Sequence, residues 1–238
     1  MEENDKFVMQ LCVNSYKGEY GEVKKGIITQ IAIFDKGNVQ GFMGTKDDVL
    51  YIVFEGTNGV RDWLDNSKFF QKKLKKSFSM QKELQFQKNS KVHYGFYDQY
   101  MRVEEDIKQR IYEKKYKKIV CTGHSLGGAL ATLCAFWVSS FHESVECVTF
   151  GSPRVGNKYF TKMFNWRIPN SRRYVYKNDL IAKLPLLWLF YSYRHVSSKV
   201  SLGKKKSWWR KLLRPISTAV GSIQDHYPQR YLEAINGK

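Results

Sequence analysis

The sequence lacks the segments that direct proteins into or across membranes. No apolar run approaches the roughly 18 residues of a transmembrane helix, so we expect none. The first residues are acidic and polar, whereas a secretory signal begins with basic residues and continues into an apolar stretch. We therefore expect an intracellular protein, which could still bind membranes or lipid droplets peripherally.

Cysteine is also scarce. The four cysteines show no C-x-x-C spacing and have no histidine cluster beside them, so we expect no zinc site. Each one has apolar neighbours, which predicts buried and reduced thiols. They are Cys12, Cys121, Cys134 and Cys147.

Acidic residues are few, with 22 Asp and Glu against 40 Lys and Arg, and the formal charge is +18. From Cys147 to Gln224 there are sixteen basic residues and one acid, Asp179. From Ser67 to Lys91 there are eight lysines and one acid, Glu83. Such charge attracts nucleic acid, anionic lipid headgroups or acidic proteins. No helix-turn-helix, RRM or zinc-finger pattern is present, so we do not expect specific nucleic-acid binding.

The hydrophobic patterns alternate between strands and helices. Strands are expected over Gly26–Phe34, Asn38–Met43, Val49–Phe54, Lys118–Thr122, Val145–Phe150 and Tyr174–Tyr176. Helices are expected over about 3–16, around Tyr100–Ile111, over Ser125–Ser139 and over Tyr227–Ile235. Ser67–Lys91 is expected to form a solvated loop or an exposed helix. This alternation predicts an α/β fold with a mostly parallel central sheet flanked by helices, and a single domain over residues 1–238.

One short motif carries chemistry. Gly123-His124-Ser125-Leu126-Gly127 fits G-x-S-x-G and lies between a predicted buried strand and a predicted buried helix, as a nucleophile elbow requires. The turn lifts the serine hydroxyl above the sheet, and the two glycines remove side chains that would collide there. The Leu126 N–H, at the start of the helix, can then face a developing oxyanion. These features predict a nucleophilic Ser125.

A nucleophilic serine needs a base, and the base needs an acid that orients it. After such an elbow the acid comes before the histidine. Asp179 follows a predicted strand at its carboxyl end, where α/β sheets place their sites. His195 and His226 both follow Asp179. His195 lies in Tyr193–Val196, which resembles a strand, whereas His226 lies in a loop, which favours His226 as the base without excluding His195.

The chain resembles the class 3 lipases, which are fungal-lipase-like α/β hydrolases. Seven segments in the order of that family carry the resemblance. They are Val53–Thr57 with Asp62-Trp63, Val92–Phe96, Gly123–Ala131, Phe150–Asn157, Asn178-Asp179 with Leu184-Pro185, Tyr193–Val196, and Asp225-His226 with Tyr231.

The resemblance implies a Ser125, Asp179 and His226 triad and an oxyanion donor at Thr57 beside Leu126. It also implies that Asn58–Asn66 is a lid. The implied activity is hydrolysis of acylglycerol esters through an acyl-enzyme, without a metal or an organic cofactor. The family usually has Arg where this chain has Glu55, a reversal of charge beside the oxyanion strand.

Two other functions stay open. The family also includes phospholipases A1, which use the same triad, so anionic phospholipids are an alternative substrate. A catalytically inactive lipase-like binder is a second alternative, although all three triad residues are present.

A helix over Gly203–Arg214 would place Trp208 and Trp209 on one face and basic residues on the other. This pattern favours docking on an anionic membrane, but it also fits a helix whose tryptophan face packs on the core.

Overall fold

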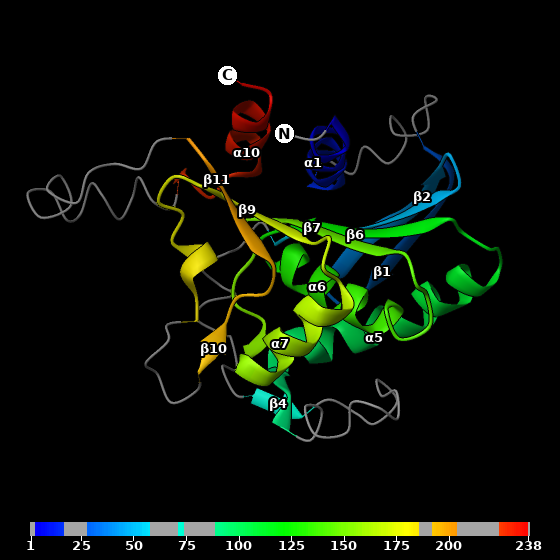
Figure 1. Ribbon diagram of the computed structural model, residues 1–238. Coiled ribbons are helices and arrows are strands. Elements are labelled where there is room, and N and C mark those ends of the chain that lie inside the picture. The colour runs from blue at the N-terminus through cyan, green and yellow to red at the C-terminus, as the bar shows by residue number, and fades with distance from the viewer. Residues whose placement is uncertain are drawn as a thin grey trace, which may run out of the picture.

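A seven-stranded sheet forms the centre of the computed structural model, which describes residues 3–16, 28–57, 71–73, 89–185, 192–203 and 224–237. The strands follow the order β1-β2-β3-β6-β7-β9-β11. The pairs β3–β6, β6–β7, β7–β9 and β9–β11 are parallel, and β1–β2 and β2–β3 are antiparallel. The expected mostly parallel sheet is therefore confirmed (Figure 1). The strands are β1 Thr29–Lys36, β2 Val39–Lys46, β3 Val49–Phe54, β6 Lys118–His124, β7 Val145–Phe150, β9 Arg172–Tyr176 and β11 Ser198–Leu202.

Two tight hairpins join the antiparallel strands. Lys36 pairs with Val39, and Lys46 pairs with Val49, so each connection has two residues. Both residues of each connection have positive φ: Gly37 and Asn38 in the first, Asp47 and Asp48 in the second. Such turns match the twist of the strands, and Gly, Asn and Asp tolerate this backbone best.

Helices cover both faces of the sheet, which makes three layers. Figure 1 shows α1 and α10 on one face and α5, α6 and α7 on the other. The buried apolar side chains form two clusters, one on each side of the sheet. Helix α6 is apolar along its whole length, and every residue in it is buried, as the sequence predicts for Ser125–Ser139. The helices are α1 Glu3–Tyr16, α5 Tyr94–Tyr112, α6 Leu126–Val138, α7 Lys158–Arg167 and α10 Pro228–Ile235, with a 3-10 turn, η3, over Ile181–Lys183.

A second, four-stranded sheet has the order β10-β8-β5-β4. Its strands are β4 Gln71–Lys73, β5 Lys91–His93, β8 Gly156–Asn157 and β10 Tyr193–Arg194. The expectation that Ser67–Lys91 forms a loop or a helix is wrong at β4, which lies within this range, and at Lys91, where β5 begins. β4 and β5 pair antiparallel, and Val92 is buried while Lys72 and Lys73 of β4 are exposed. The residues between them lie outside the described part of the chain.

His195 is not in a strand, contrary to the prediction. β10 ends at Arg194, and β11 begins at Ser198 after Ser197, whose φ is +64°. The chain therefore leaves one sheet and joins the other across His195. The sequence also gave no sign of α7 or β11, since both expose many polar residues.

The four cysteines are buried and form no disulfide, so the prediction of reduced thiols is confirmed. Burial raises the pKa of Cys12 to about 12 and raises that of Cys147 as well. No helix within the described ranges is long and apolar enough to cross a membrane.

Candidate active site

Ser125 occupies a strained turn between β6 and α6. It is the N-cap of α6 and has φ +58° and ψ −125°, outside the usual regions for a residue with a side chain. Gly123 is required here, since a Cβ on it would come within 2.3 Å of the Gly127 backbone. A Cβ on Gly127 would come within 2.3 Å of the Phe54 carbonyl oxygen. The G-x-S-x-G spacing therefore lets β6, α6 and the end of β3 meet around the serine.

The structure brings Ser125, His226 and Asp179 together from three distant parts of the chain. His226 Nε2 lies 2.7 Å from Ser125 Oγ, and His226 Nδ1 lies 2.7 Å from Asp179 Oδ2. Asp179 comes three residues after β9, and His226 comes two residues before α10. All three side chains are buried or nearly so, with Asp179 fully buried. With its Nδ1–H donated to Asp179, the imidazole presents an Nε2 lone pair to the serine hydroxyl.

Asp179 accepts further hydrogen bonds that fix its carboxylate. Oδ1 accepts from the Ile181 N–H at 2.8 Å and from the Ala182 N–H at 3.2 Å, both in η3. Oδ2 accepts from the Tyr231 hydroxyl of α10 at 2.5 Å. Burial and the adjacent Asp179 charge raise the pKa of Tyr231 well above its usual range, which keeps this hydroxyl protonated. The acid is thus held by donors from two elements as well as by His226.

A second histidine packs against His226. The ring of His124, at the end of β6, has its centroid 4.6 Å from that of His226. Its Nδ1 lies 2.8 Å from the hydroxyl of Tyr16, the last residue of α1. Burial, and then the neighbouring His226, lower the pKa of His124 well below its usual range. His124 therefore stays neutral and adds no positive charge beside the imidazole that would accept a proton.

Thr57 and Leu126 lie where β3 and α6 converge. Thr57 follows β3 by three residues, and the Phe54 and Glu55 carbonyls pack directly against Gly127 of α6. Leu126 is the first residue of α6, and helical geometry supplies no acceptor for an N–H in the first turn. The predicted role of both residues as oxyanion donors stays a prediction, with this geometry as its basis.

Two other acids after Ser125 make contacts away from His226. Glu146 lies in β7, where it pairs with Lys118 at 3.0 Å and with Arg172. Asp225 accepts a hydrogen bond from the Asn178 N–H at 3.3 Å, which ties the loop of His226 to that of Asp179. His195 donates to the Ala182 carbonyl and makes no hydrogen bond to Ser125 or Asp179 within the described residues.

Tyr16 and Gly151 were not anticipated from the sequence. Gly151 has φ +59°, and a Cβ on it would lie 3.0 Å from Asp179 Oδ2 and 3.1 Å from His226 Nδ1. The glycine thus leaves room for the acid and base to meet. Tyr16 is separated from His124 by more than one hundred residues, so no local pattern connects them. The only signal for Gly151 in the sequence was its place in the segment Phe150–Asn157 of the family resemblance.

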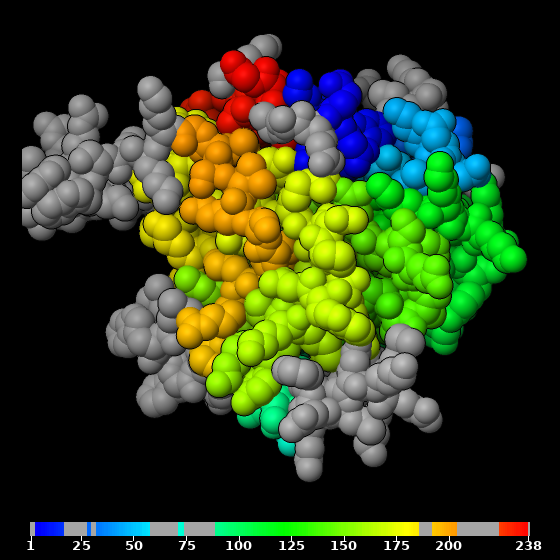
Figure 2. Space-filling view, in the orientation of Figure 1, coloured from blue at the N-terminus to red at the C-terminus, as the bar shows by residue number. Residues whose placement is uncertain are grey.

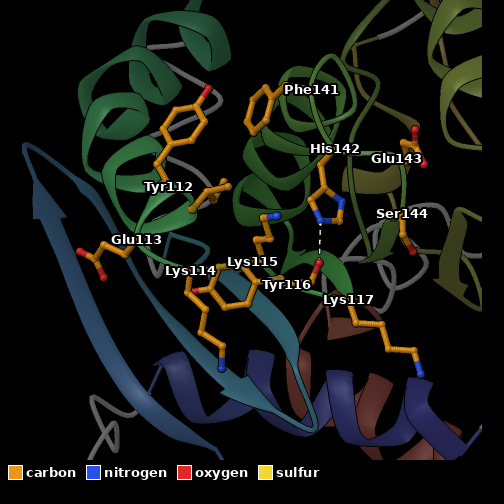
Figure 3. Close-up of a pocket in the computed structure, with 11 residues that line it drawn as sticks. Tyr112, Glu113, Lys114, Lys115, Tyr116, Lys117, Phe141, His142, Glu143 and Ser144 are labelled. Atoms are coloured by element: carbon orange, nitrogen blue, oxygen red, sulfur yellow. Dashed lines mark hydrogen bonds between the residues drawn. The ribbon is translucent and has the colours of Figure 1, made fainter.

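Several predicted features fall outside the described residues. They are the lid at Asn58–Asn66, most of Leu184–Tyr193 and the basic, tryptophan-containing segment after Gly203. In the part of the chain that is described, no three His, Cys, Asp or Glu side chains are grouped to hold a metal ion. A separate pocket of about 970 Å³ lies between the turns at 111–117 and 141–144 (Figure 3). Those turns precede β6 and β7, at the end of the sheet opposite Ser125.

Comparison with known proteins decides the family. A profile described as Lipase (class 3) matches residues 51–188, more than half of the chain. The chain belongs to the class 3 lipase family. Within this lipase family, a secreted mono- and diacylglycerol lipase of Fusarium solani is 29% identical over 182 residues, which cover 74% of this chain and 51% of that protein.

Two further relatives extend the comparison. The phospholipase A1-II 5 of Oryza sativa subsp. indica is 37% identical over 125 residues. These residues cover 48% of this chain and 26% of that protein. The solved triacylglyceride lipase of Rhizomucor miehei has a TM-score of 0.71 at 23% identity and covers 94% of this chain and 91% of that one. This likeness confirms the α/β-hydrolase fold. The chain spans about half of the length of the Fusarium relative and about a quarter of the length of the rice relative.

Proposed function

We propose that this protein is a serine-dependent carboxylic ester hydrolase that acts on acylglycerols. The observation that carries the proposal is the unbroken chain of hydrogen bonds from Ser125 through His226 to Asp179, 2.7 Å at each step. This arrangement lets His226 take the Ser125 proton while the hydroxyl oxygen attacks an ester carbonyl. Asp179 then stabilises the imidazolium and keeps the ring in the reactive tautomer.

The remaining steps use backbone donors and water. The N–H groups of Thr57 and Leu126 stabilise the tetrahedral oxyanion, a contribution of about 3–4 kcal/mol for each donor. His226 returns its proton to the leaving alcohol, and the acyl group stays on Ser125. Water, activated by His226, then hydrolyses the acyl-enzyme. Every group in this cycle belongs to the chain or to water, so the proposal includes no cofactor.

The Fusarium relative supports mono- and diacylglycerols as the first substrates to test. The rice relative, described as a phospholipase A1, supports a second candidate, hydrolysis of a phospholipid acyl ester by the same triad. A panel of mono-, di- and triacylglycerols with anionic and zwitterionic phospholipids separates the two. Turnover of glycerides at least ten times faster than phospholipids supports the first candidate, and the reverse supports the second.

We also propose that the protein works on an anionic lipid surface. Helix α7 and strands β10 and β11 form one face of the molecule (Figure 2). Their exposed charged residues are all basic: Lys158, Lys162, Arg194 and Lys199. Each Lys or Arg near such a surface contributes about 1 kcal/mol, so binding must weaken as salt rises. Co-sedimentation with anionic vesicles that does not depend on salt would contradict this part.

One domain over residues 1–238 is part of the same proposal. The central sheet takes its strands from residue 29 to residue 202, and α1 and α10 pack together on its face, which supports a single folding unit. Limited proteolysis tests it: two separately stable fragments, each with its own cooperative unfolding, would contradict a single domain.

The test of the ester hydrolase is a pair of serine variants. Ser125→Ala should remove nearly all turnover of a chromogenic ester and keep the circular dichroism of the native protein. Ser198→Ala, at an exposed position in β11, is the matched control and should keep wild-type activity. Wild-type turnover by purified Ser125→Ala would overturn the assignment.

A further inference from the structure

Arg173 is a buried cation without a hydrogen-bond partner. It lies in β9 and is 6% exposed, and its Nε is buried with no acceptor. Within the residues that the structure describes, its guanidinium donates no hydrogen bond. Burial lowers its pKa to about 10, which still leaves the group charged at neutral pH. A buried charge of this kind is costly unless an opposite charge or hydrogen bonds accompany it.

The preceding residue shows what ordinary pairing looks like in the same strand. Arg172 points to the other face of the sheet, where it donates to both oxygens of Asp5 at 2.7 and 2.8 Å and also to Glu146. Arg173 has no such carboxylate. Its register neighbours are Thr149 on β7 and Lys199 on β11, and Lys199 adds positive charge.

Two more basic groups lie near Arg173. Arg154 is anchored through Nη1, which donates to the Lys183 and Pro185 carbonyl oxygens, the latter at 2.6 Å. His195 donates to the Ala182 carbonyl, and its Nδ1 is buried without a partner. Burial, and then the charges of Arg173 and Arg154, lower the pKa of His195 strongly.

Among the residues that the structure describes, no carboxylate acts on Arg173 or Arg154. From residue 147 to residue 224 the sequence contains one acid, Asp179, and its two oxygens already accept from His226, Tyr231 and η3. Thus neither the rest of residues 147–185 and 192–203 nor the segments that directly follow Pro185 and Gly203 can supply a further carboxylate.

We propose that Arg173 and Arg154 hold a small inorganic anion of about the size of chloride, beside His195. The anion would accept the hydrogen bonds that Arg173 lacks and would offset the repulsion between the two guanidinium groups. Because the Arg173 side chain is 6% exposed, the proposal takes a small ion rather than a lipid phosphate as the ligand. The site is distinct from the proposed ester chemistry and does not depend on it.

The site adjoins the loop that holds Asp179. Ala182 accepts from His195 through its carbonyl and donates to Asp179 Oδ1 through its N–H at 3.2 Å. One peptide segment therefore contacts both the cationic cluster and the acid. Occupancy by an anion should stabilise η3 and, with it, the whole fold.

Thermal unfolding in chloride and in gluconate at equal ionic strength tests the proposal, since gluconate is too large to enter. If the anion binds with a Kd of about 10 mM, 0.2 M chloride should raise the wild-type Tm by about 4–7 °C over gluconate. Arg173→Met should lose this rise and, in gluconate, should be at least as stable as wild type because a buried unpaired charge is gone. Lys162→Met, which removes an exposed charge on α7, is the control and should keep the full rise.

Anomalous scattering from a bromide-soaked crystal of the wild type gives a test without a variant. The proposal expects a bromide peak within about 3.5 Å of the Arg173 guanidinium. If Arg173→Met does not fold, Arg154→Met replaces it. Equal Tm values in chloride and gluconate, or an equal chloride rise in Arg173→Met, would overturn the proposal. A bromide peak without any chloride effect on Tm would mean an adventitious ion only and would overturn it as well.

Discussion

Removing the Tyr231 hydroxyl should destabilise the protein more than it slows catalysis. In Tyr231→Phe, Asp179 loses a 2.5 Å hydrogen bond in a site where both side chains are fully buried. Water cannot replace the donor there, and a hydrogen bond to a charged group contributes about 1.5–3 kcal/mol. For a domain of this size, that loss corresponds to a fall in Tm of about 3–12 °C.

Catalysis should change less, because three donors remain on Asp179. His226 still donates to Oδ2, and Ile181 and Ala182 still donate to Oδ1, so the imidazole keeps its tautomer. We expect kcat to fall by about ten-fold or less, with KM unchanged.

Differential scanning calorimetry and ester turnover measure the two effects on the same preparations. Tyr227→Phe is the control, because Tyr227 follows His226 directly but is 59% exposed. An unchanged Tm in Tyr231→Phe would refute the stabilising bond. A loss of kcat near 10³-fold with an unchanged Tm would show that Tyr231 acts on the chemistry itself.

Three further predictions concern other parts of the site and core. Asp179→Asn should lower kcat by about 10⁴-fold with native circular dichroism, because the imidazole would adopt the wrong tautomer; a loss under ten-fold would point to another acid. Gly151→Ala should lower the free energy of unfolding by about 1–2 kcal/mol, because φ is +59° there, and should also reduce activity. Gly237→Ala, at φ +79° with open space around it, is the control and should keep full activity. Equal activity in the two variants would contradict the close contact of Gly151 with His226. Burial lowers the pKa of His93 to about 4, so the stability that depends on its neutral form is present above about pH 6.5 and is lost as the pH falls towards 4. His93→Asn, which keeps an N-cap acceptor for α5, should show a smaller fall in Tm over that range, and an identical fall would contradict the assignment.

The fold could be predicted where hydrophobic periodicity is strong. The strands Val49–Phe54 and Val145–Phe150 match the prediction residue for residue, since each is a short apolar run between turns. Helix α7 and strand β11 were not predicted, because their many polar residues face solvent and mask the hydrophobic periodicity. The short strands of the second sheet depend on pairing between distant residues, such as Val92 with Gly156, which no local pattern contains.

The site could be predicted from the sequence where its chemistry requires particular residues at short, fixed spacings. The elbow needs glycines around Ser125, so it is visible in five residues. Asp179 follows a predicted strand and His226 precedes a predicted helix, and the family resemblance favoured His226 over His195. The contacts of Tyr16 with His124 depend on how α1 packs on the sheet, so they appear only in three dimensions.

The most direct test of the ester hydrolase is covalent labelling by an alkyl phosphonate fluoride, which reacts with an activated serine as an ester would. Peptide mass spectrometry should find one phosphonate adduct, on Ser125, formed together with the loss of esterase activity. His226→Ala should label at least about 10³-fold more slowly, because the serine then lacks its base. Full inactivation with Ser125 unmodified, or equal labelling rates in wild type and His226→Ala, would contradict the assignment of the triad.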